Sequence, residues 1–176
     1  MDIFAELAMM QERIRANNGD AFESHYQSLC ASADSEMARR IAGTDLSYYN
    51  DRQFDAYCKA IKKARSVEAR AIYFEYDLDN DWQSSFYICK EYAELEAADD
   101  DWACRWVSQV RGSCIPAFTK IYSRTDKFGQ TPLATSITLF LIARTTAALR
   151  ATVARKSPGT IQICLGFHDQ DPIHRL

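Results

Sequence analysis

The stretch VEARAIYFEYDLDNDWQSSFYICKEY, residues 67–92, decides the fold of this chain. Its two halves, Val67–Leu78 and Trp82–Tyr92, are rich in aromatic and β-branched residues that alternate with polar ones. Alternation with a period of two is typical of a β-strand with one buried face. The residues between the halves, Asp79–Asp81, are turn formers that tolerate positive φ. The stretch therefore predicts an antiparallel hairpin.

Three helical patterns precede the hairpin. Apolar residues recur at helical spacing in Asp2–Asn17 and again in Asp20–Ala42. A third pattern begins near Asn50 or Asp51 and ends in basic residues around Arg65. Basic residues at this end complement the negative end of the helix dipole, so we expect a solvated helix end there.

A long helix is expected after the hairpin. Thr131 followed by Pro132 is a typical helix start, and the pattern continues to about Arg155. The longest uncharged stretch, Phe128–Ala143, overlaps this helix, but it contains a proline and several polar residues. Because a membrane span needs about 20 mostly apolar residues, we expect a buried helix and no membrane contact. Its buried side is expected to carry Leu133, Ile137, Phe140, Leu141 and Ala148.

The remaining segments complete the fold prediction. Trp102–Val110 fits either a short helix or a third strand, Pro116–Tyr122 fits a short helix, and Thr160–Phe167 fits a final strand. A length of 176 residues favours one domain, residues 1–176. The order predicts an α+β domain in which the N-terminal helices and the long C-terminal-half helix pack on a mainly antiparallel sheet, built around the 67–92 hairpin.

Composition limits the compartment and the partners. The net charge of −3 argues against a protein that coats nucleic acid by bulk electrostatics. The first residues, Met1–Glu6, carry acids where a secretory signal would carry bases. The six cysteines lie far apart without a CxxC pair, as expected of reduced thiols. We expect a cytoplasmic protein that binds neither nucleic acid nor membranes.

The acidic residues are concentrated in one part of the chain. Residues 72–101 contain ten acids and one base, whereas residues 102–176 contain ten bases and three acids. Aromatic residues are interleaved with these acids. Protein interfaces use aromatic rings for contact energy and charges for fast, oriented association. We therefore predict a surface for a basic partner that consists of Asp77, Asp79, Asp81, Trp82, Glu94, Glu96, Asp99, Asp100, Asp101 and Trp102.

Two other interpretations of this stretch remain open. The acids could serve only to solvate one face, and the tryptophans could be core residues. Because burial of a tryptophan beside several carboxylates is costly, we expect at least one of Trp82 and Trp102 to be partly exposed. A calcium loop starting at Asp77 is disfavoured, because Trp82 occupies the position of its glycine and Ile88 that of its bidentate glutamate.

The best candidates for enzyme chemistry lie near the end of the sequence. The alternative function is a metal-dependent enzyme or small hydrolase that uses the histidines and aspartates of residues 168–174. The spacing of these residues matches no known zinc framework. Cys164 and His168 lie about 13 Å apart on a regular strand, too far for a nucleophile–base pair. The sequence contains no P-loop, GxSxG or HExxH motif. We predict no catalytic residue and no cofactor; the weak metal candidates are His168, Asp169, Asp171 and His174.

The acidic–aromatic hairpin, Tyr73–Tyr87, followed by Asp99–Trp102 in a small acidic domain, resembles bacterial immunity proteins. Those proteins bind a cognate toxin or secreted effector in the cytosol and block its active site. The resemblance implies function by occlusion. The acidic surface would enter a basic active-site cleft that normally binds an anionic substrate, and it would compete with phosphate for arginine and lysine side chains.

Overall fold

The computed structural model describes residues 2–16, 19–97, 99–127 and 131–176. Two predictions extend outside them: the end of the first helix at Asn17, and the first three residues of the uncharged stretch Phe128–Ala143. The helices are α1 (Ile3–Arg15), α2 (Gly19–Ala33), α3 (Ser35–Ala42), α4 (Ser47–Ser66), α5 (Pro116–Tyr122) and α6 (Pro132–Ala154). The strands are β1 (Ala71–Asp77), β2 (Gln83–Cys89), β3 (Trp106–Arg111), β4 (Gln162–Phe167) and β5 (His174–Arg175), with 3-10 turns η1 (Leu95–Ala97) and η2 (Asp101–Cys104).

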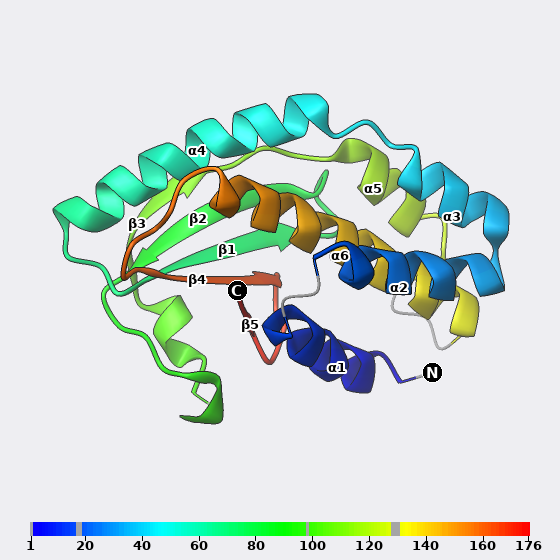
Figure 1. The fold of residues 1–176 in the computed structure, drawn as a ribbon, viewed down its shortest axis with the longest axis horizontal. Helices are drawn as coiled ribbons and strands as arrows, with labels where there is room; N and C mark the ends of the chain where they lie inside the picture. Colours follow the sequence, from blue (N-terminus) through cyan, green and yellow to red (C-terminus); the bar gives the residue numbers. More distant parts are fainter. Residues whose placement is uncertain (1, 17–18, 98, 128–130) are drawn as a thin grey trace.

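The strands form one sheet in the order β3-β2-β1-β4-β5. β1 and β2 pair as the predicted hairpin, in a register that runs from Ala71 opposite Cys89 to Asp77 opposite Gln83. β4 lies parallel to β1, and the other pairs are antiparallel. The single parallel pair arises because the chain crosses back through α6 before β4 begins, as Figure 1 shows. The predicted α+β fold with a mainly antiparallel sheet around the hairpin is confirmed.

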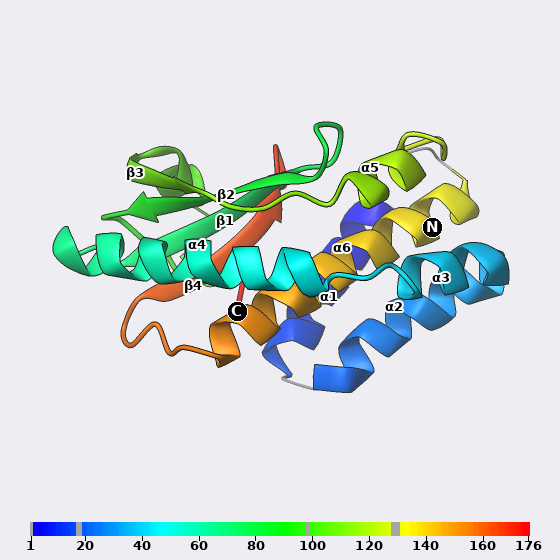
Figure 2. The same ribbon diagram turned by 90° about the horizontal axis from the view of Figure 1, so that it is seen from above.

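α4 and α6 lie on one face of the sheet, and α2 and α3 lie beyond α6 (Figure 2). The even-numbered residues of β1, Ile72, Phe74 and Tyr76, belong to the large core between these layers. α6 starts as predicted, since the Thr131 side chain accepts a hydrogen bond from the Ala134 backbone N–H at 3.1 Å. Leu133 does not belong to the predicted buried side, because it is 41% exposed in the first turn, before α6 enters the core.

α6 is long and apolar enough to cross a membrane by length and composition alone, and it is the one such helix in the described part of the chain. However, 67% of its most apolar window is buried inside the protein. Packing against the sheet and the other helices therefore accounts for its composition.

Two sequence predictions of element boundaries need correction. The predicted helix Asp20–Ala42 is two helices, because Asp34 ends α2 and caps α3 by accepting a hydrogen bond from the Met37 backbone N–H at 2.8 Å. Trp102–Val110, which fitted a helix or a strand, contains both: the end of η2 and most of β3.

Candidate functional site

The face of the sheet opposite α4 and α6 is only partly covered. A small second core lies there, in which Tyr73, Cys89 and Cys164 pack against Trp102 and Ile173. Beside it is an open depression of about 740 Å³ between strands β1 to β3, the η2 segment and the turn after β4. We call it the acidic hollow and define it by its carboxylates and aromatic rings: Glu75, Asp99, Asp101, Asp169, Asp171, Tyr73, Tyr87 and Trp106.

A row of aromatic rings forms the floor of the acidic hollow. Tyr73 and Tyr87 are direct cross-strand neighbours, and their rings stack with centroids 6.1 Å apart. The Trp106 ring follows at 5.4 Å from Tyr87. Tyr73 is 5% exposed and Trp106 is 48% exposed, so the row runs from the core to the solvent. Burial and the nearby Glu75 raise the pKa of both tyrosines, which therefore stay neutral at physiological pH.

The charge in the hollow has one sign. Among the described residues that line it, none is lysine or arginine. His168 is the basic group at its rim: Nδ1 lies 3.4 Å from Glu75 Oε1, and Nε2 lies 3.8 Å from Asp169 Oδ1. The side chain of Asp169 is 89% exposed. The hollow therefore presents carboxylates and an aromatic surface to anything that enters it.

Asp100 lies in the same wall but is occupied by internal contacts. Its Oδ1 lies 2.6 Å from Arg175 Nη2, and its Oδ2 accepts a hydrogen bond from the Ile173 backbone N–H at 2.7 Å. Arg175 also donates to the Ala93 carbonyl at 3.0 Å and to the Ile173 carbonyl. Asp100 is therefore a structural residue that fixes the wall of the hollow.

The predicted acidic surface is divided among three places. Asp99, Asp100 and Asp101 line the hollow, but the other predicted acids do not. Asp77 ends β1, and Asp79 and Asp81 lie in the hairpin turn, where the side chain of Asp79 pairs with Lys127 at 2.7 Å. In η1, the Glu96 carboxylate pairs with Arg15 at 2.7 Å, and just before η1 the Glu94 carboxylate accepts a hydrogen bond from the Tyr92 hydroxyl at 2.9 Å.

The expectation that Trp82 or Trp102 is partly exposed is wrong. The two side chains are 0% and 2% exposed. Trp82 adopts a positive φ of 53° at the end of the turn, and its indole N–H donates to Thr145 Oγ1 of α6 at 2.9 Å. The indole thus enters the core without its acidic neighbours. Trp102 packs against Tyr92 at 5.4 Å, beside the guanidinium of Arg175. Neither tryptophan offers a surface to a partner.

The C-terminal metal candidates do not form a cluster. His168, Asp169 and Asp171 line the hollow, but His174 is buried and its Nε2–H donates to the Leu7 carbonyl of α1 at 3.0 Å. The described residues contain no group of three or more His, Cys, Asp or Glu side chains placed to hold a metal. Burial also raises the pKa of the Cys164 thiol to about 12, which leaves it a poor nucleophile.

Sequence reasoning missed Glu75 and Trp106 as members of the site. Strand alternation places Glu75 on the same face as Tyr73, and this signal was available from the sequence. The sequence carries no such signal for the approach of Asp169 and Asp171 to Glu75. That approach depends on the parallel pairing of β4 with β1, which brings together residues about 90 positions apart.

Comparisons with known proteins give no relative for this chain. No protein-family model matches it, and neither a curated protein nor a solved structure matches it.

Proposed function

We propose that this protein is a binding module that recognises a basic surface of another protein through the acidic hollow. The observation that carries the proposal is the half-exposed Trp106, which stands beside several carboxylates in a depression whose described lining contains no lysine or arginine. A guanidinium or ammonium group can lie over an exposed indole ring while its N–H groups reach nearby carboxylates. Arginine suits such a site best, because its planar group stacks and donates in a fork.

The shape of the site favours a protein partner. Aromatic residues in a concave surface with a charged rim are typical of interface hot spots. The rigid floor of paired strands would bind without much reordering, which lowers the entropic cost of association. Charges at the rim would mainly speed the encounter with a partner of opposite charge.

The resemblance to bacterial immunity proteins gives this binding a purpose. In this proposal the protein enters the basic active-site cleft of a cognate toxin or effector in the cytoplasm and blocks access of an anionic substrate. The alternative, an enzyme that uses the C-terminal histidines and aspartates, has less support, because His174 is buried away from the other three residues.

A rescue experiment tests this function. Reading frames adjacent to the gene are expressed one at a time, and any toxic product is co-expressed with the wild-type chain, with a Glu75→Lys/Asp101→Lys/Asp169→Lys variant, and with an Asp79→Lys/Asp81→Lys control. The proposal expects rescue by the wild type and the control, and loss of rescue by the hollow variant. It fails if no neighbouring product is toxic and rescued, or if the hollow variant rescues as well as the wild type.

A further inference from the structure

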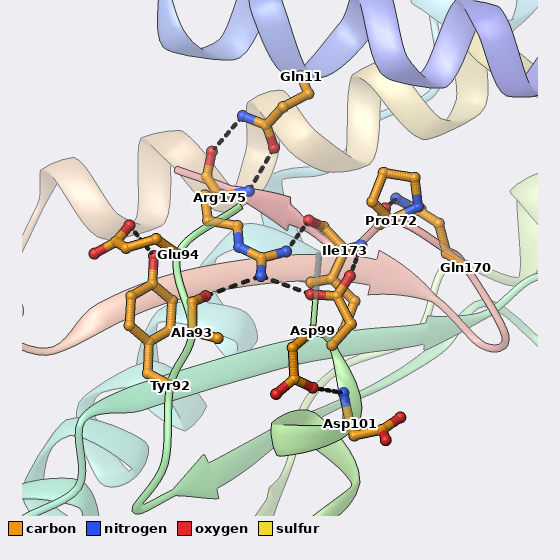
Figure 3. Close-up of polar contacts among 11 residues, drawn as sticks. Gln11, Tyr92, Ala93, Glu94, Asp99, Asp101, Gln170, Pro172, Ile173 and Arg175 are labelled. Atoms are coloured by element: carbon orange, nitrogen blue, oxygen red, sulfur yellow. Dashed lines mark hydrogen bonds and ion pairs between the residues drawn. The ribbon is translucent and has the colours of Figure 1, made fainter. Parts of the chain in front are cut away.

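The two edges of the sheet differ in whether their outward backbone groups are hydrogen-bonded. At the β5 edge, the Gln11 side chain of α1 donates to the Arg175 carbonyl at 3.1 Å and accepts from the Arg175 backbone N–H at 2.7 Å (Figure 3). One amide side chain thus pairs both backbone polar groups of Arg175. A closed edge of this kind cannot accept another strand.

The β3 edge is open. β3 ends the strand order, and no strand of the described chain pairs with its outer side. Trp106 and Val107 are 48% and 49% exposed, and a register irregularity between Ile88 and Cys89 leaves Val107 without a partner on β2. Two large apolar side chains therefore stand beside unpaired backbone, which is the usual template for strand addition.

The direction of the free backbone groups follows from the pairing with β2. The backbone carbonyl of Ser84 on β2 accepts a hydrogen bond from the Gly112 backbone N–H at 2.8 Å, and the backbone N–H of Ser84 donates to the Ser113 carbonyl at 3.0 Å. In an antiparallel pair, the backbone groups of every second residue point toward the partner strand. The backbone N–H and carbonyl groups of Val110 and Ser108, which lie opposite Phe86 and Ile88, therefore also point toward β2. The backbone N–H and carbonyl groups of Gln109 then face outward.

We propose that the β3 edge pairs with an extended segment of the partner that carries arginine or lysine at every second position. This inference rests on the proposed function and adds the mode of binding. A strand added beside β3 extends the floor of the acidic hollow, and its alternate side chains lie on the same face as Trp106. Charge complementarity selects basic side chains at those positions, because the lining of the hollow supplies carboxylates.

A second copy of this chain suits the edge less well. Antiparallel pairing of two β3 strands about a twofold axis would place two acidic hollows on one continuous face, where they repel each other. The basic residues at the two ends of β3 are already engaged: Arg105, just before the strand, pairs with Glu91 at 2.7 Å, and Arg111, its last residue, donates to Gln83 at 3.1 Å. They do not neutralise the hollow.

Synthetic peptides test the proposal by calorimetry. The probes are a nine-residue peptide that alternates arginine and threonine, a peptide of the same composition with its arginines grouped, and the alternating peptide with N-methyl groups along one edge. We expect the alternating peptide to bind at least tenfold more tightly than the other two. Gln109→Pro should lose at least tenfold in affinity, because proline blocks the outer edge without removing an inward hydrogen bond. Gln109→Ala is the matched control: it also removes the side-chain hydrogen bond to Ser85, but it keeps the outward backbone N–H, so it should retain the affinity.

The outcomes separate the two proposals. Equal affinity for all three peptides overturns strand addition even if Gln109→Pro does not fold. If the three peptides bind equally and all lose binding in a Glu75→Gln/Asp101→Asn/Asp169→Asn variant, strand addition is wrong but the acidic hollow is still the binding site. If no peptide binds the wild type, both proposals fail. A dimer of the free protein that Gln109→Pro dissociates would also overturn the inference, in favour of a second copy on this edge.

Discussion

Asp100 and Arg175 form an ion pair across 75 positions of the sequence, with 2.6 Å between Oδ1 and Nη2. Their side chains are 21% and 9% exposed. Because Gln11 binds the backbone of the same arginine, this pair connects the wall of the acidic hollow to α1. The position of Asp99 and Asp101 in the hollow therefore depends on a contact with the C-terminal segment.

Replacement of Asp100 tests this dependence. Asp100→Ala leaves a largely buried arginine without its carboxylate partner and should lower the free energy of unfolding by about 3 kcal/mol. Asp101→Ala is the matched control, because this neighbour is exposed, and it should change stability by less than about 0.5 kcal/mol. Urea unfolding of both variants measures the difference. Equal stabilities would show that the ion pair does not hold the wall.

The three tryptophans differ in access to solvent, and fluorescence quenching measures this directly. Trp82 and Trp102 are buried and Trp106 is half exposed. Acrylamide should therefore quench the wild type partially, and Trp106→Phe should remove most of the accessible fraction. Trp82→Phe and Trp102→Phe should leave that fraction in place. The placement of Trp106 is wrong if its replacement does not reduce quenching.

The packing of α6 predicts different costs for two leucines on one helix. Leu141 is 0% exposed in the core and Leu133 is 41% exposed at the start of the helix. Leu141→Ala should destabilise the protein by about 2–5 kcal/mol, because it leaves a cavity in a packed interior. Leu133→Ala should cost less than about 0.5 kcal/mol. Similar losses for the two variants in thermal or urea unfolding would contradict the burial of this helix.

His174 makes the stability depend on pH. Burial lowers the pKa of its imidazole to about 4 in the folded protein, below the ordinary value of 6.5. Between these values the unfolded chain binds a proton that the folded protein does not, so the free energy of unfolding falls as the pH decreases from 6.5 towards 4. The slope from this group approaches about 1.4 kcal/mol per pH unit.

His174→Gln should remove this contribution, since glutamine does not titrate and can still donate to the Leu7 carbonyl. The stability of the variant should fall less steeply below pH 6.5 than that of the wild type. Parallel curves for the two proteins would mean that His174 is not buried in its neutral form.

Local signals in the sequence predicted most of the fold. The hairpin follows from the alternation around Tyr73 and Tyr87, and α6 begins at the Thr131 cap as expected. The break at Asp34 was missed because a helix cap within a continuous amphipathic pattern resembles an ordinary polar position. β5 was missed because a strand of two residues has no periodicity and is held by Asp100 and Gln11.

The site was less predictable, because charge along the sequence does not show which face a side chain occupies. Residues 72–101 are strongly acidic, yet their carboxylates lie in different places: some at the hairpin turn, one in an ion pair with Arg15 of α1, and others in the hollow. Acidic neighbours in the sequence do not indicate whether a tryptophan side chain is exposed. Trp82 shows why: Asp81 and Trp82 both adopt positive φ at the end of the turn, and the indole then enters the core while Asp81 stays exposed.

The indole N–H signals of the three tryptophans provide the most direct test that the acidic hollow binds a basic partner. In an NMR titration with an oligo-arginine peptide, the account predicts that the Trp106 signal shifts and saturates, that added salt reverses the shift, and that the Trp82 and Trp102 signals stay in place as internal controls. A Trp106 signal that does not respond, or that responds equally in the Glu75→Gln/Asp101→Asn/Asp169→Asn variant, would contradict the account.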